Sequence, residues 1–154
     1  MDLEKYTDRS KAFVQAAQTL ALSRNHQWFT SEHLLCVLIE DKEGLAANLI
    51  TAAGGRPKEI RAGTDAALSK LPSVEGGGAG QVYLAPETAR LFEATEKIAE
   101  KAGDRFVTAE RLLLALAMAK ETPSGGILEG AGVSPQALNT AINDVRKGRT
   151  ADSA

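Results

Sequence analysis

The sequence has little of what marks a secreted, membrane or nucleic-acid-binding protein. A single cysteine, Cys36, cannot form an internal disulfide, which agrees with a reducing compartment. Eighteen Lys and Arg against twenty Asp and Glu give a net charge of −2, which excludes a broad attraction to phosphate backbones or anionic lipid. No stretch approaches the ~20 apolar residues of a membrane span. The N-terminal MDLEKYTDRS fits neither a secretory signal nor a transit peptide. We expect a cytoplasmic protein without nucleic-acid or membrane partners.

What the sequence does contain is an internal duplication. The segment 30–38, TSEHLLCVL, returns as TAERLLLAL at 108–116, a shift of 78 residues. Each copy has a Thr suited to capping a helix, a Glu near the positive end of the helix dipole, and leucines at helical spacing. The same shift aligns Ala-Gly pairs and prolines farther along, so two copies of one helical unit are expected to pack together about a pseudo-twofold axis.

Each copy predicts four helices, so we expect an all-α fold of eight helices in two four-helix repeats. The first helix of each repeat starts at Thr7 or Asp8 and near Pro86. The core helices follow, and the third ends at a glycine suited to a left-handed helix end, Gly54 or Gly132. The fourth begins with a proline, where the missing N–H costs nothing. Those prolines are Pro57 and Pro135. On the first helix of each repeat, the spacing places two sets of residues on the buried face: Phe13, Ala16, Ala17, Leu20 and Ala21, and then Leu91, Ala94, Thr95, Ile98 and Ala102.

The domain boundaries follow from composition. We expect one domain over 1–148, with repeat one at about 1–71 and repeat two at about 81–148. Between them, 72–80 reads PSVEGGGAG, a linker rich in helix-breaking residues. The last segment, 149–154, has no periodicity and is expected to begin a flexible tether to something outside this chain.

No motif in the sequence specifies catalysis, a cofactor or a metal. The glycines of 76–80 lack the Gly-Lys-Ser/Thr ending of a phosphate loop and no strand precedes them. His33 and Cys36 are three residues apart on one helix, but a metal site needs further ligands and the second repeat has none at those places. A Cys–His nucleophile fails similarly, because nothing orients His26 or His33. We therefore expect no enzyme, no catalytic residue, no metal and no cofactor in this chain.

Two further pairs have a structural and a functional interpretation. Glu32 and Glu110 could act as an acid–base pair, but each lies second in its helix, where dipole compensation explains a carboxylate. Trp28 and Phe106 lie at equivalent turns, and we expect them to fill the core; the alternative is that they border an apolar groove.

The quoted strings resemble a known family. MDLEKYTDRSKAFVQAAQTLALSRNHQWFTSEHLLCVLIED at the start, LPSVEGGGAGQVYLAPET in the middle and AGDRFVTAERLLLALA after it are similar to the N-terminal domains of the Clp unfoldases. The resemblance covers essentially the whole chain. The middle string favours the ClpB disaggregases over ClpA and ClpC, whose N-terminal domains share the doubled four-helix architecture.

The resemblance implies a mobile module of a homohexameric ring ATPase that engages unfolded or aggregated polypeptide and helps to deliver it to the axial pore. ATP and magnesium would belong to AAA+ domains outside this chain, and the whole protein would cooperate with a DnaK-type chaperone. The isolated domain is expected to be a monomer. The alternative within the family is docking of a folded adaptor, as in ClpA and ClpC.

The same resemblance implies a binding surface. Its contact residues match Thr7, Asp104 and Glu110, with an apolar groove beside them at which Phe92 takes the place of a large aliphatic residue. Arg111 departs from a position that is frequently apolar in the family.

Overall fold

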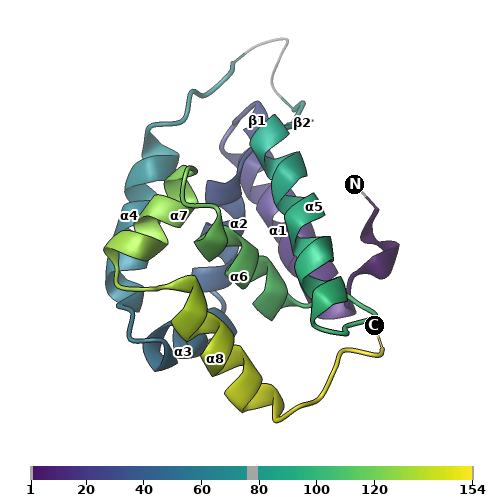
Figure 1. Ribbon diagram of the computed structural model, residues 1–154. Coiled ribbons are helices and arrows are strands. Elements are labelled where there is room, and N and C mark those ends of the chain that lie inside the picture. Colours follow the sequence, from purple (N-terminus) through teal and green to yellow (C-terminus); the bar gives the residue numbers. More distant parts are fainter. Residues whose placement is uncertain (1, 76–79, 154) are drawn as a thin grey trace.

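Two sets of four helices follow one another along the chain, each set ending in a helix that begins with proline (Figure 1). The structure, a computed structural model, describes residues 2–75 and 80–153. Its elements are the 3-10 helix η1 (Leu3–Lys5), α1 (Asp8–Ser23), β1 (Trp28–Phe29), α2 (Ser31–Ile39), α3 (Leu45–Ala52), α4 (Pro57–Ser69), β2 (Tyr83–Leu84), α5 (Pro86–Lys101), α6 (Ala109–Met118), α7 (Pro123–Gly130) and α8 (Pro135–Arg146). The predicted all-α fold of eight helices is confirmed for the described residues. None of these helices is long and apolar enough to cross a membrane.

The predicted helix ends are also confirmed. The hydroxyl oxygen of Thr7 accepts the Ser10 N–H at the start of α1, and that of Thr108 caps α6. Gly54 and Gly132 follow α3 and α7 with φ of +88° and +89°, the left-handed conformation that favours glycine.

Helices α2 and α6 form the centre of the molecule and contact one another. The leucines that repeat with the 78-residue shift are all buried: Leu34, Leu35, Leu38, Leu112, Leu113 and Leu116. The flanking helices pack around this pair, α1 against α2 and α5 against α6 (Figure 1).

The two halves are related by a pseudo-twofold arrangement in which they exchange contacts. Helix α3 packs on α8 and, equivalently, α4 packs on α7. At the meeting point a Cβ on Gly55 would lie 2.4 Å from Cγ2 of Val133, the residue that takes its place in the second half. The Arg56 N–H donates to the Ala131 carbonyl at 2.9 Å. Each half thus covers part of the third and fourth helices of the other.

Short parallel pairings, which periodicity did not reveal, also link the halves. Phe29 of β1 pairs with Leu84 of β2, and Val107 pairs with Tyr6. The two pairings are equivalent under the 78-residue shift, because Leu84 corresponds to Tyr6 and Val107 corresponds to Phe29. The N-terminal end of each half therefore adds to the turn of the other half.

The buried face of α1 is rotated from the predicted one. Its inward residues are Ser10, Val14, Ala17 and Ala21, whereas Ala16 is exposed and Phe13 and Leu20 are half-buried. Ser10 turns inward because its hydroxyl donates to the Val107 carbonyl at 2.7 Å.

In α5 the inward set is Thr88, Leu91, Phe92, Thr95 and Ala99. Thr88 donates to the Phe29 carbonyl at 2.8 Å in the same way, and this places Ala94 on the outside. In both helices a hydroxyl that hydrogen-bonds to a backbone carbonyl of the other half lies on the buried face, so the helix is turned away from the orientation that the apolar pattern predicted.

The segments after α4 and α8 are held in the same manner. Ser73 pairs with His26, and the N–H groups of Arg105 and Phe106 donate to the Ala151 carbonyl at 2.8 and 3.0 Å. Ala151 is the 78-residue equivalent of Ser73. Ala151, within the segment 149–154 that is expected to begin a tether, thus contacts the turn before α6. The central linker positions 76–79 lie outside the described residues.

Candidate functional site

Asp104 and Glu110 come together around one arginine from the last helix. Arg146 Nη1 lies 2.6 Å from Asp104 Oδ1, and its Nη2 lies 3.0 Å from Glu110 Oε2. The same Nη2 donates to the Thr108 hydroxyl at 2.8 Å. The start of α6 and the end of α8 are therefore joined by a network of ion pairs.

The second oxygen of Asp104 is also occupied. Arg111 Nε lies 3.1 Å from Oδ2, and the Ala151 N–H donates to Oδ1 at 2.9 Å. Burial alone would raise the pKa of the Asp104 carboxyl, but the Ala151 N–H and the two guanidinium groups more than offset this and lower the pKa. The Asp104 side chain is fully buried and that of Glu110 is 20% exposed. In this conformation the network ties the fold together and offers only Glu110 to a partner.

Thr7 lies beside this network, because its N–H donates to the Val107 carbonyl at 2.9 Å, whereas Phe92 lies in the core. Thr7 is half-buried, and its side chain caps α1. Phe92 is 3% exposed and its ring lies edge-on to those of Tyr6 and Phe29, at centroid distances of 6.1 and 6.2 Å. The structure places Phe92 in the core, because α5 turns that face inward. The four residues implied by the resemblance do not form one open apolar surface.

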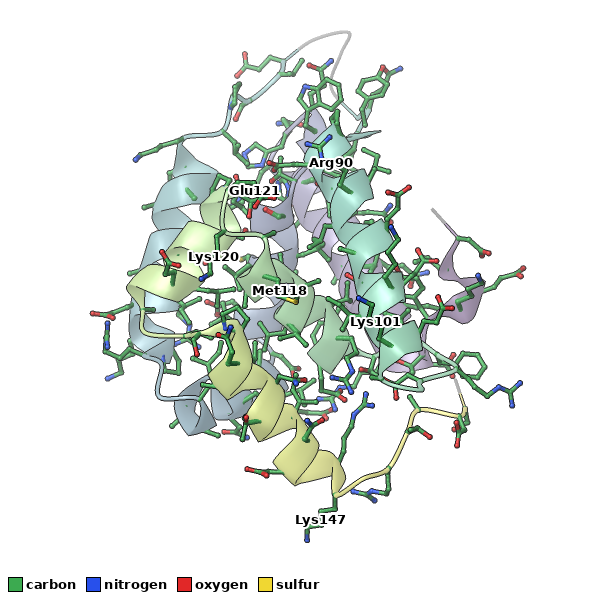
Figure 2. All side chains as sticks on the ribbon, viewed as in Figure 1. Arg90, Lys101, Met118, Lys120, Glu121 and Lys147 are labelled. Carbon is green, nitrogen blue, oxygen red and sulfur yellow. The ribbon has the colours of Figure 1, made fainter. Side chains whose placement is uncertain are left out.

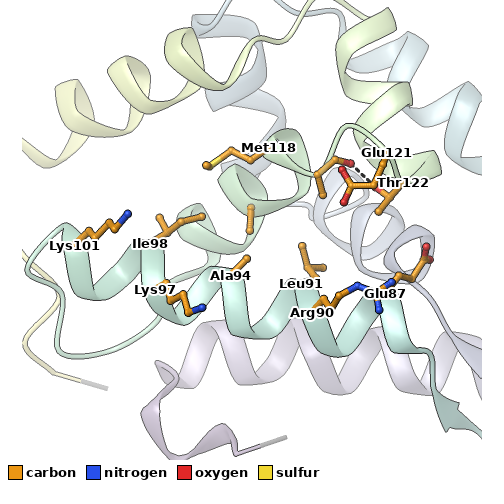
Figure 3. A pocket seen from close by; sticks show the side chains of 12 residues that line it. Glu87, Arg90, Leu91, Ala94, Lys97, Ile98, Lys101, Met118, Glu121 and Thr122 are labelled. Atoms are coloured by element: carbon orange, nitrogen blue, oxygen red, sulfur yellow. Dashed lines mark hydrogen bonds between the residues drawn. The ribbon is translucent and has the colours of Figure 1, made fainter.

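An open apolar surface does exist, between α5 and α6 and the start of α7 (Figure 3). It is a groove of about 630 Å³. Its apolar lining consists of Leu91, Ala94, Ile98, Ala115, Met118 and Ala119. Met118, the last residue of α6, is 53% exposed and its side chain lies across from Ile98. This side chain gives the groove its most accessible apolar contact.

The groove continues toward α8. A second hollow of about 370 Å³ shares Ile98, Lys101 and Met118 with the first and reaches Arg111. The Arg111 guanidinium there is held by Asp104 and by Asn139. The ion-pair network thus borders the groove at this end.

Charged side chains border the groove unevenly. Lys97 and Lys101 lie toward the C-terminal end of α5, whereas Glu87 and Glu121 lie at the other end (Figure 3). Figure 2 shows Arg90, Lys101 and Met118 on one face of the molecule. Burial, with a smaller effect of Glu32, raises the pKa of the Glu87 carboxyl, and the charge of Arg90 opposes this. Lys97 and Lys101 make one end of the groove basic, and at the other end Glu87 and Glu121 outnumber Arg90.

The residues considered for chemistry have structural partners. Both ring nitrogens of His33 are hydrogen-bonded, to Thr30 and to His26, so neither is available to a metal. Within residues 2–75 and 80–153 no three His, Cys, Asp or Glu side chains gather as metal ligands do. Burial raises the pKa of the Cys36 thiol, the opposite of what a nucleophile needs. Glu32 is buried and accepts a hydrogen bond from Ser31 at 3.1 Å.

The expectation that Trp28 fills the core is wrong. Its side chain is 50% exposed and lies against Tyr83, with the ring centroids 5.7 Å apart. Successive residues of a strand point to opposite faces, so in β1 Phe29 takes the inward position and Trp28 the outward one. Phe106 is half-buried.

Comparison with known proteins agrees with this architecture. The model of the Clp repeat (R) N-terminal domain matches residues 5–131. The chain belongs to this family. The chaperone protein ClpB of Rhodopseudomonas palustris is 58% identical over all 154 residues, as is that of Mesorhizobium japonicum. The match covers 100% of this chain and 18% of each relative, whose N-terminal region it spans.

Solved structures share the fold of this Clp N-terminal domain. The Hsp104 N-terminal domain from Candida albicans matches with a TM-score of 0.83 at 21% identity, over 97% of both chains. The N-terminal domain of the ClpV1 ATPase from E. coli has a TM-score of 0.78 at 19% identity, over 99% of this chain and 91% of that one. These likenesses support the doubled helical architecture.

The groove residues of this Clp N-terminal domain were not identified from sequence, although a signal was present. Ala94 and Ile98 were assigned to the buried face of α5 together with Leu91 and Thr95, but the other residues of that face are Thr88, Phe92 and Ala99. The helix carries more apolar surface than one packed face requires, and the excess is the groove wall. Met118 gave no periodic signal because it ends its helix.

Proposed function

We propose that this chain is the client-binding module of a ClpB-type disaggregase, engaging unfolded or aggregated polypeptide for delivery to the ring. In the whole protein, ATP and magnesium would be bound by AAA+ domains of a homohexamer that cooperates with a DnaK-type chaperone. The chain itself would be a monomer that binds no nucleotide.

The observation that carries this proposal is the groove between α5 and α6. It is open, lined with aliphatic side chains and long enough to follow much of α5. Such a surface suits short apolar segments of many sequences, because dispersion contacts and apolar burial require no particular side chain. Met118 supports this use, since an unbranched thioether side chain adapts to differently shaped partners.

Binding through this groove is expected to be weak. An unfolded client loses conformational freedom when it binds, and an open groove buries too little apolar area to offset that loss strongly. We expect a dissociation constant in the micromolar range or weaker, a binding free energy no stronger than about −8 kcal/mol. Several tethered copies in a ring would raise the effective concentration of sites, so weak contacts could still retain an aggregate.

The test is a titration of the 154-residue chain with a reduced and alkylated, permanently unfolded protein, followed by amide NMR shifts. We expect shifts at Leu91, Ala94, Ile98 and Met118 that disappear in Met118→Asp. The matched control is Val145→Asp, which also replaces an exposed apolar residue (58% exposed) but on α8, outside the groove. Shifts elsewhere, or equal binding by both variants, would remove the groove from consideration.

The same preparation should show no ATP turnover. Binding of a stoichiometric folded adaptor at the groove, with no response to the unfolded protein, would favour the adaptor-docking alternative.

A further inference from the structure

We infer that the groove selects apolar segments that carry acidic residues at one end, next to Lys97 and Lys101. This inference rests on the proposed function and adds to it the charge pattern of the preferred client.

The two lysines are placed to act together. Lys97 and Lys101 are four residues apart on α5, so they project from one side of the helix about 6 Å apart. Both border the groove, and Lys101 also borders the second hollow. Neither forms an ion pair with any carboxylate of residues 2–75 and 80–153. Arg90 also lines the groove, but it lies at the end that carries Glu87 and Glu121. Lys97 and Lys101 thus give their own end of the groove a local excess of positive charge.

The apolar contacts lie beside these lysines rather than under them. Ala94 and Ile98, on the adjacent side of α5, face Met118 across the groove (Figure 3). An occupant lying along α5 would place apolar side chains between Ile98 and Met118 and continue toward Lys101. At the opposite end the charges of Glu87 and Glu121 outnumber that of Arg90 and disfavour an acidic segment, so the two ends of the groove differ in their charge preference.

An extended client matches this spacing. Alternate side chains of an extended chain lie on one face about 7 Å apart, close to the separation of the two lysines. A segment with several apolar residues followed by Glu-X-Glu therefore presents two carboxylates to Lys97 and Lys101. The preference would be local, because the chain as a whole carries a net charge of −2 and does not attract acidic peptides in general.

The experiment uses three synthetic peptides that share one apolar sequence of Leu, Phe and Ala and end in Glu-Ala-Glu, Gln-Ala-Gln or Lys-Ala-Lys. Each is titrated into the 154-residue chain at low and high salt. At low salt we expect the Glu peptide to bind roughly three- to tenfold more tightly than the Gln peptide, and the Lys peptide most weakly. High salt should reduce these differences.

The variant Lys97→Gln/Lys101→Gln should abolish the preference while it retains binding of the Gln peptide. Its matched control, Lys58→Gln/Lys70→Gln, removes two exposed lysines at α4, outside the groove, and should leave the preference intact. A spin label at the acidic end should broaden amides near Lys101 more than those near Glu87.

Several outcomes would overturn the inference. Equal affinities for the Glu and Gln peptides, or a preference that survives in Lys97→Gln/Lys101→Gln, would remove the charge selection but leave the apolar groove as a client site. If no peptide shifts the groove amides, both the inference and the proposed function fail. Groove shifts on concentrating the chain alone would assign the groove to a second copy.

Discussion

Nδ1 of His26 lies 2.9 Å from Nε2 of His33 in the interior of the first half. The Thr30 N–H donates to Nδ1 of His33 at 3.0 Å, so the proton of neutral His33 belongs on Nε2 and is donated to His26. Asp104 and Arg111 occupy the equivalent positions in the second half, with Oδ2 and Nε 3.1 Å apart. The same pair of positions ties each turn to its core helix, through neutral rings in one half and opposite charges in the other.

The histidine pair predicts a loss of stability in mild acid. Burial, with a smaller effect of His26, lowers the pKa of His33 to about 4. The unfolded chain binds this proton near pH 6.5, so between pH 6.5 and 4 the unfolded state holds more protons and the free energy of unfolding falls as the pH falls. We expect a loss on the order of 3 kcal/mol across this window, measured by urea denaturation at a series of pH values.

The matched variant is His33→Gln. Glutamine at the third helical position can still accept the Thr30 N–H, as in a capping box, but it does not titrate. Its stability should therefore vary less than that of the parent chain between pH 4.5 and 6.5. An equally steep pH dependence in both proteins would show that other groups cause the loss.

A second prediction concerns the glycines that end α3 and α7. Both have φ near +90°, so alanine at either position costs about 1–2 kcal/mol in backbone strain. A Cβ on Gly132 would also lie 3.1 Å from Arg56 Nη1 and 3.3 Å from the Gly54 carbonyl oxygen, whereas Gly54 has nothing within 4 Å. We expect Gly132→Ala to melt a few degrees below Gly54→Ala. Equal melting temperatures would contradict the close approach of the halves at this point.

Much of the fold could be predicted from sequence because the same helix signals occur in both halves of the duplication. Caps at Thr7 and Thr108 and prolines at the start of α4 and α8 are local signals, and the structure confirms them. The pairing of Tyr6 with Val107 could not be predicted this way. This bridge joins residues that are far apart in the sequence, and the hydrophobic periodicity of one segment does not indicate which distant turn it pairs with.

The candidate site was less predictable. The resemblance directed attention to Asp104 and Phe92, which the structure buries. Asp104 is covered by its ion pairs with Arg111 and Arg146, and Phe92 is buried because of the way α5 is turned. The rotation of α5 depends on Thr88 finding the Phe29 carbonyl of the other half. The apolar residues of α5 that lie outside its buried face, such as Ala94 and Ile98, then line the groove.

The buried network around Asp104 predicts unequal effects of its two acids. Asp104→Ala would leave Arg111 and Arg146 without their shared buried carboxylate and should cost about 3–5 kcal/mol. Glu110→Ala removes a more accessible partner of Arg146 and should cost roughly 0–1 kcal/mol. Urea denaturation measures both, and hydrogen exchange should show faster opening at Ala151 in the Asp104 variant only. Equal midpoints for the two variants would mean that the network contributes little.

The last prediction separates the core residue from the contact residue. Phe92→Ala opens a cavity between Tyr6 and Phe29 and should cost about 3–5 kcal/mol. Met118→Ala removes a half-exposed side chain and should change the free energy of unfolding by less than about 1 kcal/mol.

Binding of the unfolded protein should show the reverse order. Met118→Ala should weaken the affinity severalfold, because the groove loses its most accessible apolar side chain, whereas Phe92→Ala should retain its affinity at a temperature where it stays folded. Phe92→Leu, which restores a large aliphatic side chain, should recover most of the stability and leave binding unchanged. If Phe92→Ala stays as stable as the parent chain and loses binding, Phe92 contacts the client and α5 must turn outward to present it.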